Sequence, residues 1–224
     1  MGLEIVHSVF VHGRESNMVL DINIKINRQQ IEADLLKEIK SILYKNIPRI
    51  QKVLNDKIEQ IVFQRLITGV PTITSRDIAE IGVPDINNRL ASIIRVASQS
   101  VEIKVTKGNI LRIDIGILRD DYSDLLSLAE ATFQYTSFTG SGILPWLRWL
   151  LLDGGSPVIG GFDFAPLPSI FSRTGGGIMT PGGNWNIPAN LAGTSNNNIL
   201  TRALTNIQKD LESIIKQELQ RVIK

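Results

Sequence analysis

The sequence predicts an α+β protein in which an antiparallel β-sheet packs with long amphipathic helices and carries a Gly/Pro/Trp-rich inserted arm. Segments that alternate apolar and polar residues, typical of half-buried strands, occur at 18–26 and 101–117. Long segments with apolar residues at helical spacing occur at 28–66 and in the last 26 residues. The composition then changes abruptly at 137–198. We therefore expect an α+β core (1–136), an extended arm (137–198) and a C-terminal helix that packs on the core (199–224).

The N-terminal part begins with two predicted strands, 3–11 and 18–26, joined by a polar loop. A helical region follows from about Arg28 to Leu66. Pro48 lies within it and lacks a backbone donor, so we expect two consecutive helices or one bent helix.

Loop residues dominate 69–85, with a short helix started by Ser75. Asp85 is expected to cap a helix that ends near Ser98. The segment 101–117 is the clearest hairpin, because two alternating runs flank a turn at Lys107-Gly108-Asn109. Residues 121–133 are expected to form a short helix or a loop over the sheet.

The arm holds 12 of the 18 glycines, 6 of the 9 prolines and all three tryptophans, but only four charged residues. A short helix is expected from Pro145 to Leu152, because proline suits the first turn and Gly154 follows its end. The remainder is expected to be strand fragments and loops. The segment is too apolar for a disordered linker. We therefore expect its apolar surface to be covered by something else, and another subunit is a candidate.

The tryptophans allow two interpretations of the arm. Trp146 and Trp149 are three residues apart and so share a helix face, which is either core or an interface anchor. The interface hypothesis names Trp149 first and Trp146 second, includes Trp185, and assigns Arg148 and Arg173 to carbonyls or acids at the rim. It predicts that Trp149→Ala leaves the monomer folded.

The C-terminal segment is expected to be one amphipathic helix, capped near Asn198. Its apolar stripe predicts that Leu204, Ile207 and Leu211 are buried.

Composition excludes several classes of protein. Hydrophobic residues make up 43% and the formal net charge is +2, which argues against a disordered chain and against a strongly basic nucleic-acid binder. The sequence has no cysteine, and its two histidines, His7 and His12, are expected to be surface residues without chemistry. No secretory signal or membrane span is predicted, because the longest apolar run is about half the length that a span needs.

Motif candidates for chemistry each have a simpler interpretation. Gly175-Gly176-Gly177 could cradle a phosphate, but no P-loop lysine or βαβ unit accompanies it, so a flexible or tightly packed turn is favoured. Asp120, Asp121 and Asp124 lack the alternation of a calcium loop, so a solvated acidic turn is favoured. We therefore expect no catalytic residue, no cofactor and no metal, and a non-enzymatic subunit of an assembly.

Two groups of motifs resemble a family of virion structural proteins of tailed bacteriophages, especially the contractile-tailed ones. The larger group lies in the arm and after it, and the smaller one in 66–90; together they cover about half the chain. The motifs are ILPWLRWLLLDG (143–154), SRTGGGIM (172–179), WNIP (185–188), AGT (192–194), NILTRAL (198–204), LITG (66–69), IGVPD (81–85) and RL (89–90). The segment Thr72-Ile73-Thr74 departs from the pattern.

The resemblance implies a ring-forming tail-completion or connector protein at the neck of the particle, where the head joins the tail. The implied partners are further copies in a hexamer or dodecamer, neighbouring neck, connector or tail proteins, and genomic DNA in the lumen through non-specific contact, but no membrane. The implied location is the virion, with assembly in the host cytoplasm. One alternative is a tail-terminator or other tail-associated protein. Another is a small-ligand or carbohydrate-binding module that uses Trp146, Trp149 and Trp185 as platforms.

Overall fold

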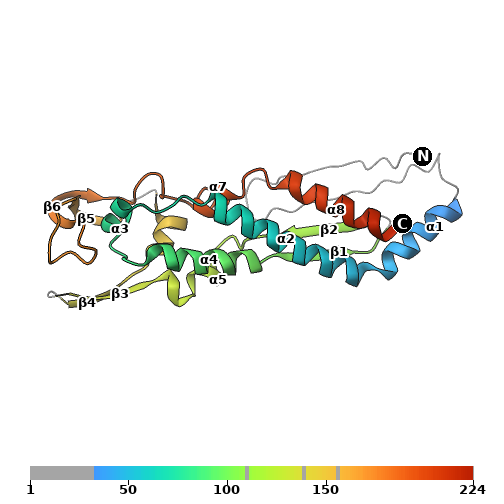
Figure 1. The fold of residues 1–224 in the computed structure, drawn as a ribbon, viewed down its shortest axis with the longest axis horizontal. Helices are drawn as coiled ribbons and strands as arrows, with labels where there is room; N and C mark the ends of the chain where they lie inside the picture. Colours follow the sequence, from blue (N-terminus) through green and yellow to red (C-terminus); the bar gives the residue numbers. More distant parts are fainter. Residues whose placement is uncertain (1–32, 109–110, 138–139, 155–156, 224) are drawn as a thin grey trace. The chain divides into compact units, whose positions relative to one another are not determined.

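The α+β fold class is confirmed by the computed structural model, which describes residues 33–108, 111–137, 140–154 and 157–223. The predicted strands at 3–11 and 18–26, with both histidines, lie outside these residues. The described part combines helices with three antiparallel sheets of two strands each (Figure 1). None of its helices has the length and the hydropathy that a membrane span requires.

Two compact units make up the chain. Among the described residues, unit 1 consists of 33–62, 98–118 and 206–223, and unit 2 consists of 63–97 and 119–205, with the gaps given above. The predicted boundaries at 136 and 198 do not coincide with this division. The arm belongs to unit 2 together with the segment 63–97, because its apolar residues are buried against that unit.

In unit 1, two whole helices and the first part of a third accompany a β-hairpin. The elements are α1 (Ala33–Lys45), the first part of α2 (Ile47–Gly69), β1 (Glu102–Thr106), β2 (Arg112–Gly116) and α8 (Gln208–Ile223). The break that Pro48 predicts is confirmed, because α1 ends at Lys45 and proline occupies the second position of α2, where no donor is needed. The predicted hairpin at 101–117 is confirmed too, with Ile103 opposite Ile115.

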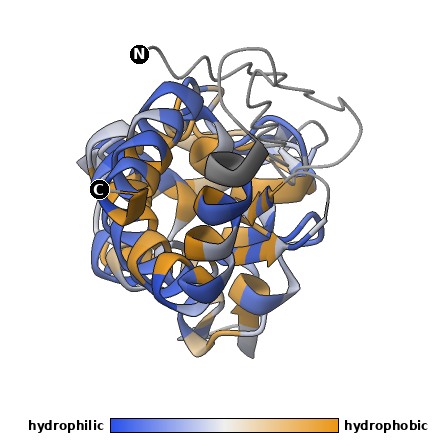
Figure 2. Cartoon of the chain, turned by 90° about the vertical axis from the view of Figure 1, so that its right-hand side faces the viewer, coloured by the Kyte–Doolittle hydropathy of each residue, from blue (hydrophilic) through white to orange (hydrophobic). Residues whose placement is uncertain are grey.

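The core of unit 1 follows the apolar stripes of its helices. Ile50, Leu54, Ile58 and Val62 recur every four residues along α2 and are at most 1% exposed. Hydrophobic and hydrophilic residues occupy different sides of the helices (Figure 2). Polar contacts fix the neighbours of α2: Gln51 Nε2 donates to the Ile103 carbonyl oxygen at 2.6 Å, and Lys57 pairs with Glu218 of α8.

The single C-terminal helix expected from the sequence is wrong. The structure has two helices, α7 (Ile199–Ala203) in unit 2 and α8 in unit 1. Between them the backbone turns at Asn206, whose φ of 65° is left-handed, a conformation that asparagine tolerates. The predicted burial of Leu204, Ile207 and Leu211 is nevertheless confirmed, because all three are at most 6% exposed.

Unit 2 is built from short elements. After the end of α2, its helices are α3 (Ser75–Ile81), α4 (Ile86–Gln99, whose last two residues fall in unit 1), α5 (Ser123–Leu126), α6 (Trp146–Arg148) and α7. A 3₁₀ turn, η1 (Ala129–Ala131), follows α5, and a π-helical turn, η2 (Trp149–Asp153), follows α6. Its strands form two hairpins, β3 (Phe133–Ser137) with β4 (Gly140–Leu144) and β5 (Ile159–Ala165) with β6 (Ile178–Trp185). The short helix expected from Ser75 and the helix expected after Asp85 are confirmed, and the segment expected to be helical from Pro145 forms α6 and the π-helical turn η2. Thr74 caps α3 through a reciprocal pair of hydrogen bonds with Asp77.

The β5–β6 hairpin is irregular. Its register shifts between Gly160 and Phe162, and Pro181 of β6 lies opposite Phe162. Gly182 and Gly183 follow with φ values of 130° and 56°, conformations that favour glycine. A Cβ on Gly183 would also lie 2.1 Å from the Asp163 carboxylate, so that side chain would have to move for any other residue there.

Candidate interaction site

The three tryptophans lie in the core of unit 2 and not on its surface. Trp146 is 0% exposed, Trp149 8% and Trp185 4%. The prediction that they are interface anchors is therefore wrong for the folded chain, because its own segments already cover the indole rings. The same burial removes the aromatic platforms on which the carbohydrate-binding alternative depends.

Each indole that has a polar partner finds it within unit 2. Trp146 Nε1 donates to the Glu130 carbonyl oxygen at 2.8 Å, and Trp185 Nε1 donates to Glu80 Oε1 at 3.2 Å. Trp149 meets Trp185 edge to face, with ring centroids 5.8 Å apart. These contacts explain how a Gly- and Pro-rich segment forms a core: the N–H groups of Trp146 and Trp185 are satisfied while the rings pack.

Asn198 closes this core from the α7 side. Its side-chain oxygen accepts from the backbone N–H groups of Leu200 and Thr201 at 3.0 and 3.1 Å, and so caps α7. Its amide group donates to the Tyr122 hydroxyl at 2.8 Å, and that hydroxyl donates to the Ser195 carbonyl oxygen. Because Asn198 is fully buried, these bonds stabilise a polar group that would otherwise be costly to bury.

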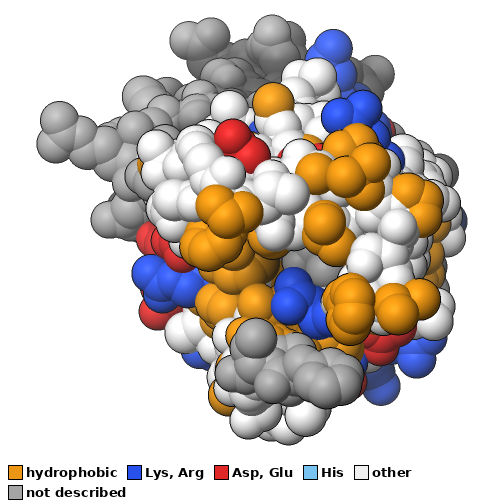
Figure 3. Space-filling model, turned by 90° about the vertical axis from the view of Figure 1, so that its left-hand side faces the viewer, with side chains coloured by type: hydrophobic (Ala, Val, Ile, Leu, Met, Phe, Trp, Pro, Cys, Tyr) orange, Lys and Arg blue, Asp and Glu red, His pale blue; other side chains and the backbone are white. Residues whose placement is uncertain are grey.

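The most exposed large apolar side chains of the arm lie in the connection between β5 and β6. We call Leu167, Ile170 and Phe171 the apolar loop; their exposed fractions are 56%, 93% and 76%, and Phe162 of β5 is 41% exposed. Figure 3 shows hydrophobic side chains gathered on the face where β5, β6, α3 and the β3–β4 hairpin lie, with few charges among them. Exposed apolar patches on soluble proteins mark interaction sites more often than chance.

Local contacts hold the apolar loop in shape. Pro166 and Pro168 flank Leu167 and restrict its backbone. Leu167 N–H donates to the Ala165 carbonyl oxygen at 2.8 Å, and Phe171 N–H donates to Ser169 Oγ at 3.1 Å. The loop is therefore presented by turns of its own, which lowers the entropy that it loses on binding.

Arg173 ties the end of the loop to α3 and β3. Its Nε donates to the Gly82 carbonyl oxygen at 3.3 Å, and its guanidinium carbon lies 4.7 Å from the centroid of the Tyr135 ring. Gly82 ends α3 with a φ of 78°, and a Cβ there would lie 2.5 Å from Arg173. Arg173 thus contacts a carbonyl, as the sequence predicts, but within its own chain.

The glycine run 175–177 is a tightly packed turn, which is the interpretation that the sequence favours. A Cβ on Gly177 would lie 2.3 Å from the Phe164 ring, and one on Gly176 would lie 2.8 Å from Ala79 Cβ. Gly175 has a φ of 75°. These three glycines are explained by close packing and a left-handed turn, so nothing about them requires a phosphate.

Charged side chains near the site pair locally. Arg148 is exposed and its Nε donates to Asp153 at 3.0 Å, so its acid partner too lies in its own chain. Arg89 donates to the Asp85 carboxylate at 2.8 Å, and this hydrogen bond lowers the pKa of Asp85. The Asp121 carboxylate accepts from the Ser123 N–H, which likewise lowers the pKa of Asp121. Within the described ranges, no group of three His, Asp or Glu side chains is placed to hold a metal ion.

The apolar loop was not predicted from the sequence. One signal was present: FAPLPSIF (164–171) is apolar, yet two prolines prevent it from continuing a strand. The spacing of apolar residues in such a segment does not predict whether their side chains are buried or exposed. No family model, no curated protein sequence and no solved structure matches this chain.

Proposed function

We propose that this chain is a non-enzymatic structural subunit of a tailed-phage particle, which forms a ring at the neck between head and tail through contacts made by the apolar loop. The observation that carries the proposal is the exposure of Ile170 and Phe171, at 93% and 76%, on a segment with almost no charge. The resemblance of the motifs in 66–90 and 143–204 to virion structural proteins supplies the biological setting.

The interface that we propose consists of the apolar loop and not of the tryptophans that the sequence suggests. Covering apolar surface stabilises a complex by about 25 cal/mol for each Å² removed from water. Ile170 and Phe171 expose most of their surface, so a neighbour that covers them gains more than one that contacts the buried indoles. The fixed turns around Pro166 and Pro168 present these two side chains in one arrangement, as a repeated contact requires.

A ring follows when one surface of a subunit binds a different surface of the next. Such a head-to-tail contact closes into a ring if the rotation between neighbours divides a full turn. In this proposal the apolar loop of one subunit binds a different surface of the next subunit, and we expect a ring of six or twelve copies. Trp185, whose indole donates to Glu80, anchors the end of the β5–β6 hairpin that lies opposite the loop, where it pairs with Ile159.

The test is the double variant Ile170→Ser with Phe171→Ser. Both side chains are exposed, so we expect circular dichroism and the thermal melt to stay as in the wild type. We expect the wild type to elute as a ring on size exclusion with light scattering and the variant to shift to the monomer by at least about tenfold in dissociation constant, a typical loss for interface anchors.

The matched control is Ile67→Ser with Ile143→Ser, which removes two apolar side chains of unit 2 that are 52% and 61% exposed and lie outside the loop. We expect this control to assemble like the wild type. A wild type that stays monomeric at all concentrations and shows no rings by negative-stain microscopy contradicts the proposal. Equal loss of assembly in both variants contradicts the assignment to the loop.

A further inference from the structure

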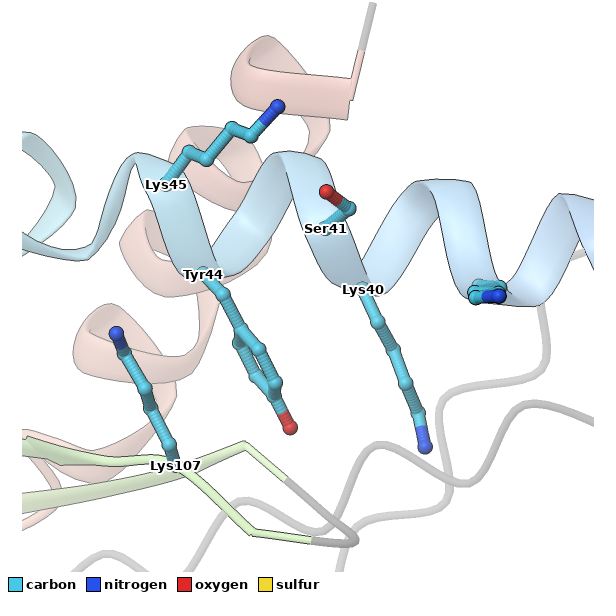
Figure 4. Close-up of a pocket in the computed structure, with 6 residues that line it drawn as sticks. Lys40, Ser41, Tyr44, Lys45 and Lys107 are labelled. Atoms are coloured by element: carbon cyan, nitrogen blue, oxygen red, sulfur yellow. The ribbon is translucent and has the colours of Figure 1, made fainter.

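Four of the six residues that line a hollow in unit 1 are lysines. Its volume is about 520 Å³, and its lining consists of Lys37, Lys40, Ser41, Tyr44, Lys45 and Lys107. We call Lys37, Lys40, Lys45 and Lys107 the lysine cluster. Three of them come from α1, and Lys107 follows β1 at the hairpin turn. Figure 4 shows Lys40 and Tyr44 extending from α1 towards the hairpin, Lys107 reaching towards α1, and Lys45 leaving α1 in another direction.

None of these four lysines forms an ion pair with a described carboxylate. The contrast is Lys57 in the same unit, which pairs with Glu218. The nearest acid in the sequence of α1 is Glu38, which is one residue from Lys37 and therefore about 100° around the helix from it; Glu38 does not line the hollow. Lys45 lies in the last turn of α1, where the helix dipole favours a cation, but the dipole accounts for this lysine alone.

Tyr44 holds the two sides of the cluster together. Its hydroxyl donates to the Gly108 carbonyl oxygen, and Lys107 Nζ lies 5.9 Å from the centroid of its ring. Lys107 and Gly108 are thus held next to α1, which brings the charge of Lys107 to the side of the helix that Tyr44 faces.

We infer that the lysine cluster binds the phosphate backbone of duplex DNA without reading its sequence. Lysine is a point charge that binds phosphate without the bidentate geometry of arginine, so the contact carries no base preference. The cluster residues on α1 extend over nine positions, Lys37 to Lys45, which is about 12 Å of helix rise, and duplex DNA carries about seven phosphates along that length. The inference goes beyond the proposed function, because a ring assembles through the apolar loop whether or not the lysine cluster touches DNA.

Duplex DNA fits the surroundings better than a membrane or single-stranded nucleic acid. Membrane-binding cationic surfaces combine lysines with inserted apolar side chains, yet the large exposed hydrophobic residues that the structure describes all belong to unit 2. Single-stranded nucleic acid is bound by stacking on open aromatic rings. Tyr44 is the aromatic residue of the hollow, and its hydroxyl and ring are already engaged.

The test compares two variants of the full chain that each lose four positive charges. The cluster variant replaces with glutamine the residues Lys37, Lys40, Lys45 and Lys107. The control replaces with glutamine four other exposed lysines of unit 1, namely Lys52, Lys104, Lys209 and Lys216. Both change the formal charge from +2 to −2, so any difference between them reflects position and not net charge. Circular dichroism checks that both fold.

Binding is measured by fluorescence anisotropy with a 30-base-pair duplex of arbitrary sequence between 50 and 200 mM salt. Each phosphate contact contributes about −0.9 to the slope of log K against log salt, so four contacts give about −3.6 and a roughly hundredfold loss over this range. We expect the cluster variant to bind at least about tenfold more weakly at 50 mM and to lose most of this slope. The control is expected to stay within about twofold of the wild type.

Equal weakening in both variants, or in neither, overturns the inference. Binding to vesicles with anionic headgroups that depends on the cluster, without binding to the duplex, assigns the cluster to a membrane and overturns it as well. Light scattering on the same samples separates the two proposals. Rings without DNA binding contradict this inference alone, whereas DNA binding by a chain that never assembles contradicts the proposed function alone.

Discussion

The two units bury their apolar residues in different ways. Unit 1 has a core of aliphatic side chains that repeat regularly along α2 and α8, such as Leu54 and Leu211. Unit 2 has a core centred on three indoles and a buried amide from irregular segments, and the N–H groups of Trp146, Trp185 and Asn198 donate to residues between 16 and 105 positions away in the sequence. The difference shows that a segment without a regular spacing of apolar residues can still form a core when its polar atoms have hydrogen-bond partners. It also shows that an apolar composition does not by itself identify an interface.

The largest effect is expected for Trp146→Ala in unit 2. The ring is fully buried and its N–H is bonded to Glu130, so the variant leaves a large cavity and an unpaired carbonyl. We expect a loss of about 3–5 kcal/mol in the free energy of unfolding, measured by urea denaturation with the fluorescence of Trp149 and Trp185. We expect Trp149→Ala to act in the same direction and not to leave the monomer unaffected. A melt unchanged in both variants would mean that the indoles are not core residues.

Leu211→Ala tests the aliphatic core of unit 1. Leu211 is fully buried in α8, and its truncation is expected to cost about 2–5 kcal/mol. Because all three tryptophans lie in unit 2, their fluorescence reports that unit, whereas far-UV circular dichroism reports the helices of both. We expect the circular dichroism midpoint to fall further than the fluorescence midpoint. Identical shifts would show that the two units unfold as one.

The smallest effect is expected for Asn198→Ala, which removes a buried cap and an amide donor together. Loss of the cap and of the hydrogen bond to Tyr122 is expected to cost about 1–3 kcal/mol. Asn198→Ser is the matched variant, because serine retains an oxygen that caps a helix but has no amide to donate to Tyr122. We expect the serine variant to lose less stability than the alanine variant in the same urea melt. Equal losses would assign the whole effect to the amide.

The periodic elements were predictable, and the irregular core was not. The positions of Pro48, Ser75 and Pro145 located helix boundaries because proline and capping residues act locally. The turn at Asn206 escaped detection because Leu204, Ile207 and Leu211 are buried on both sides of it, so the apolar stripe continues through the break.

The covering of the tryptophans depends on partners that no local pattern reveals. Trp185 bonds to Glu80, 105 residues earlier in the chain, and Tyr122 bonds to Asn198, 76 residues later. The lysine cluster has the same origin, because Lys107 joins the lysines of α1 only through the hairpin turn that Tyr44 fixes. Sequence spacing describes neighbours along a helix or strand, whereas these sites arise between elements.

Pro181 of β6 has a consequence for how this chain avoids uncontrolled polymerisation. A two-stranded hairpin has two open edges, and an open edge invites further strands to add, as in amyloid. Pro181 offers no N–H to an incoming strand, and the two glycines after it bend the backbone out of strand geometry. Strand addition along the β6 edge is therefore disfavoured, so contacts made at this edge depend on side chains and not on backbone pairing.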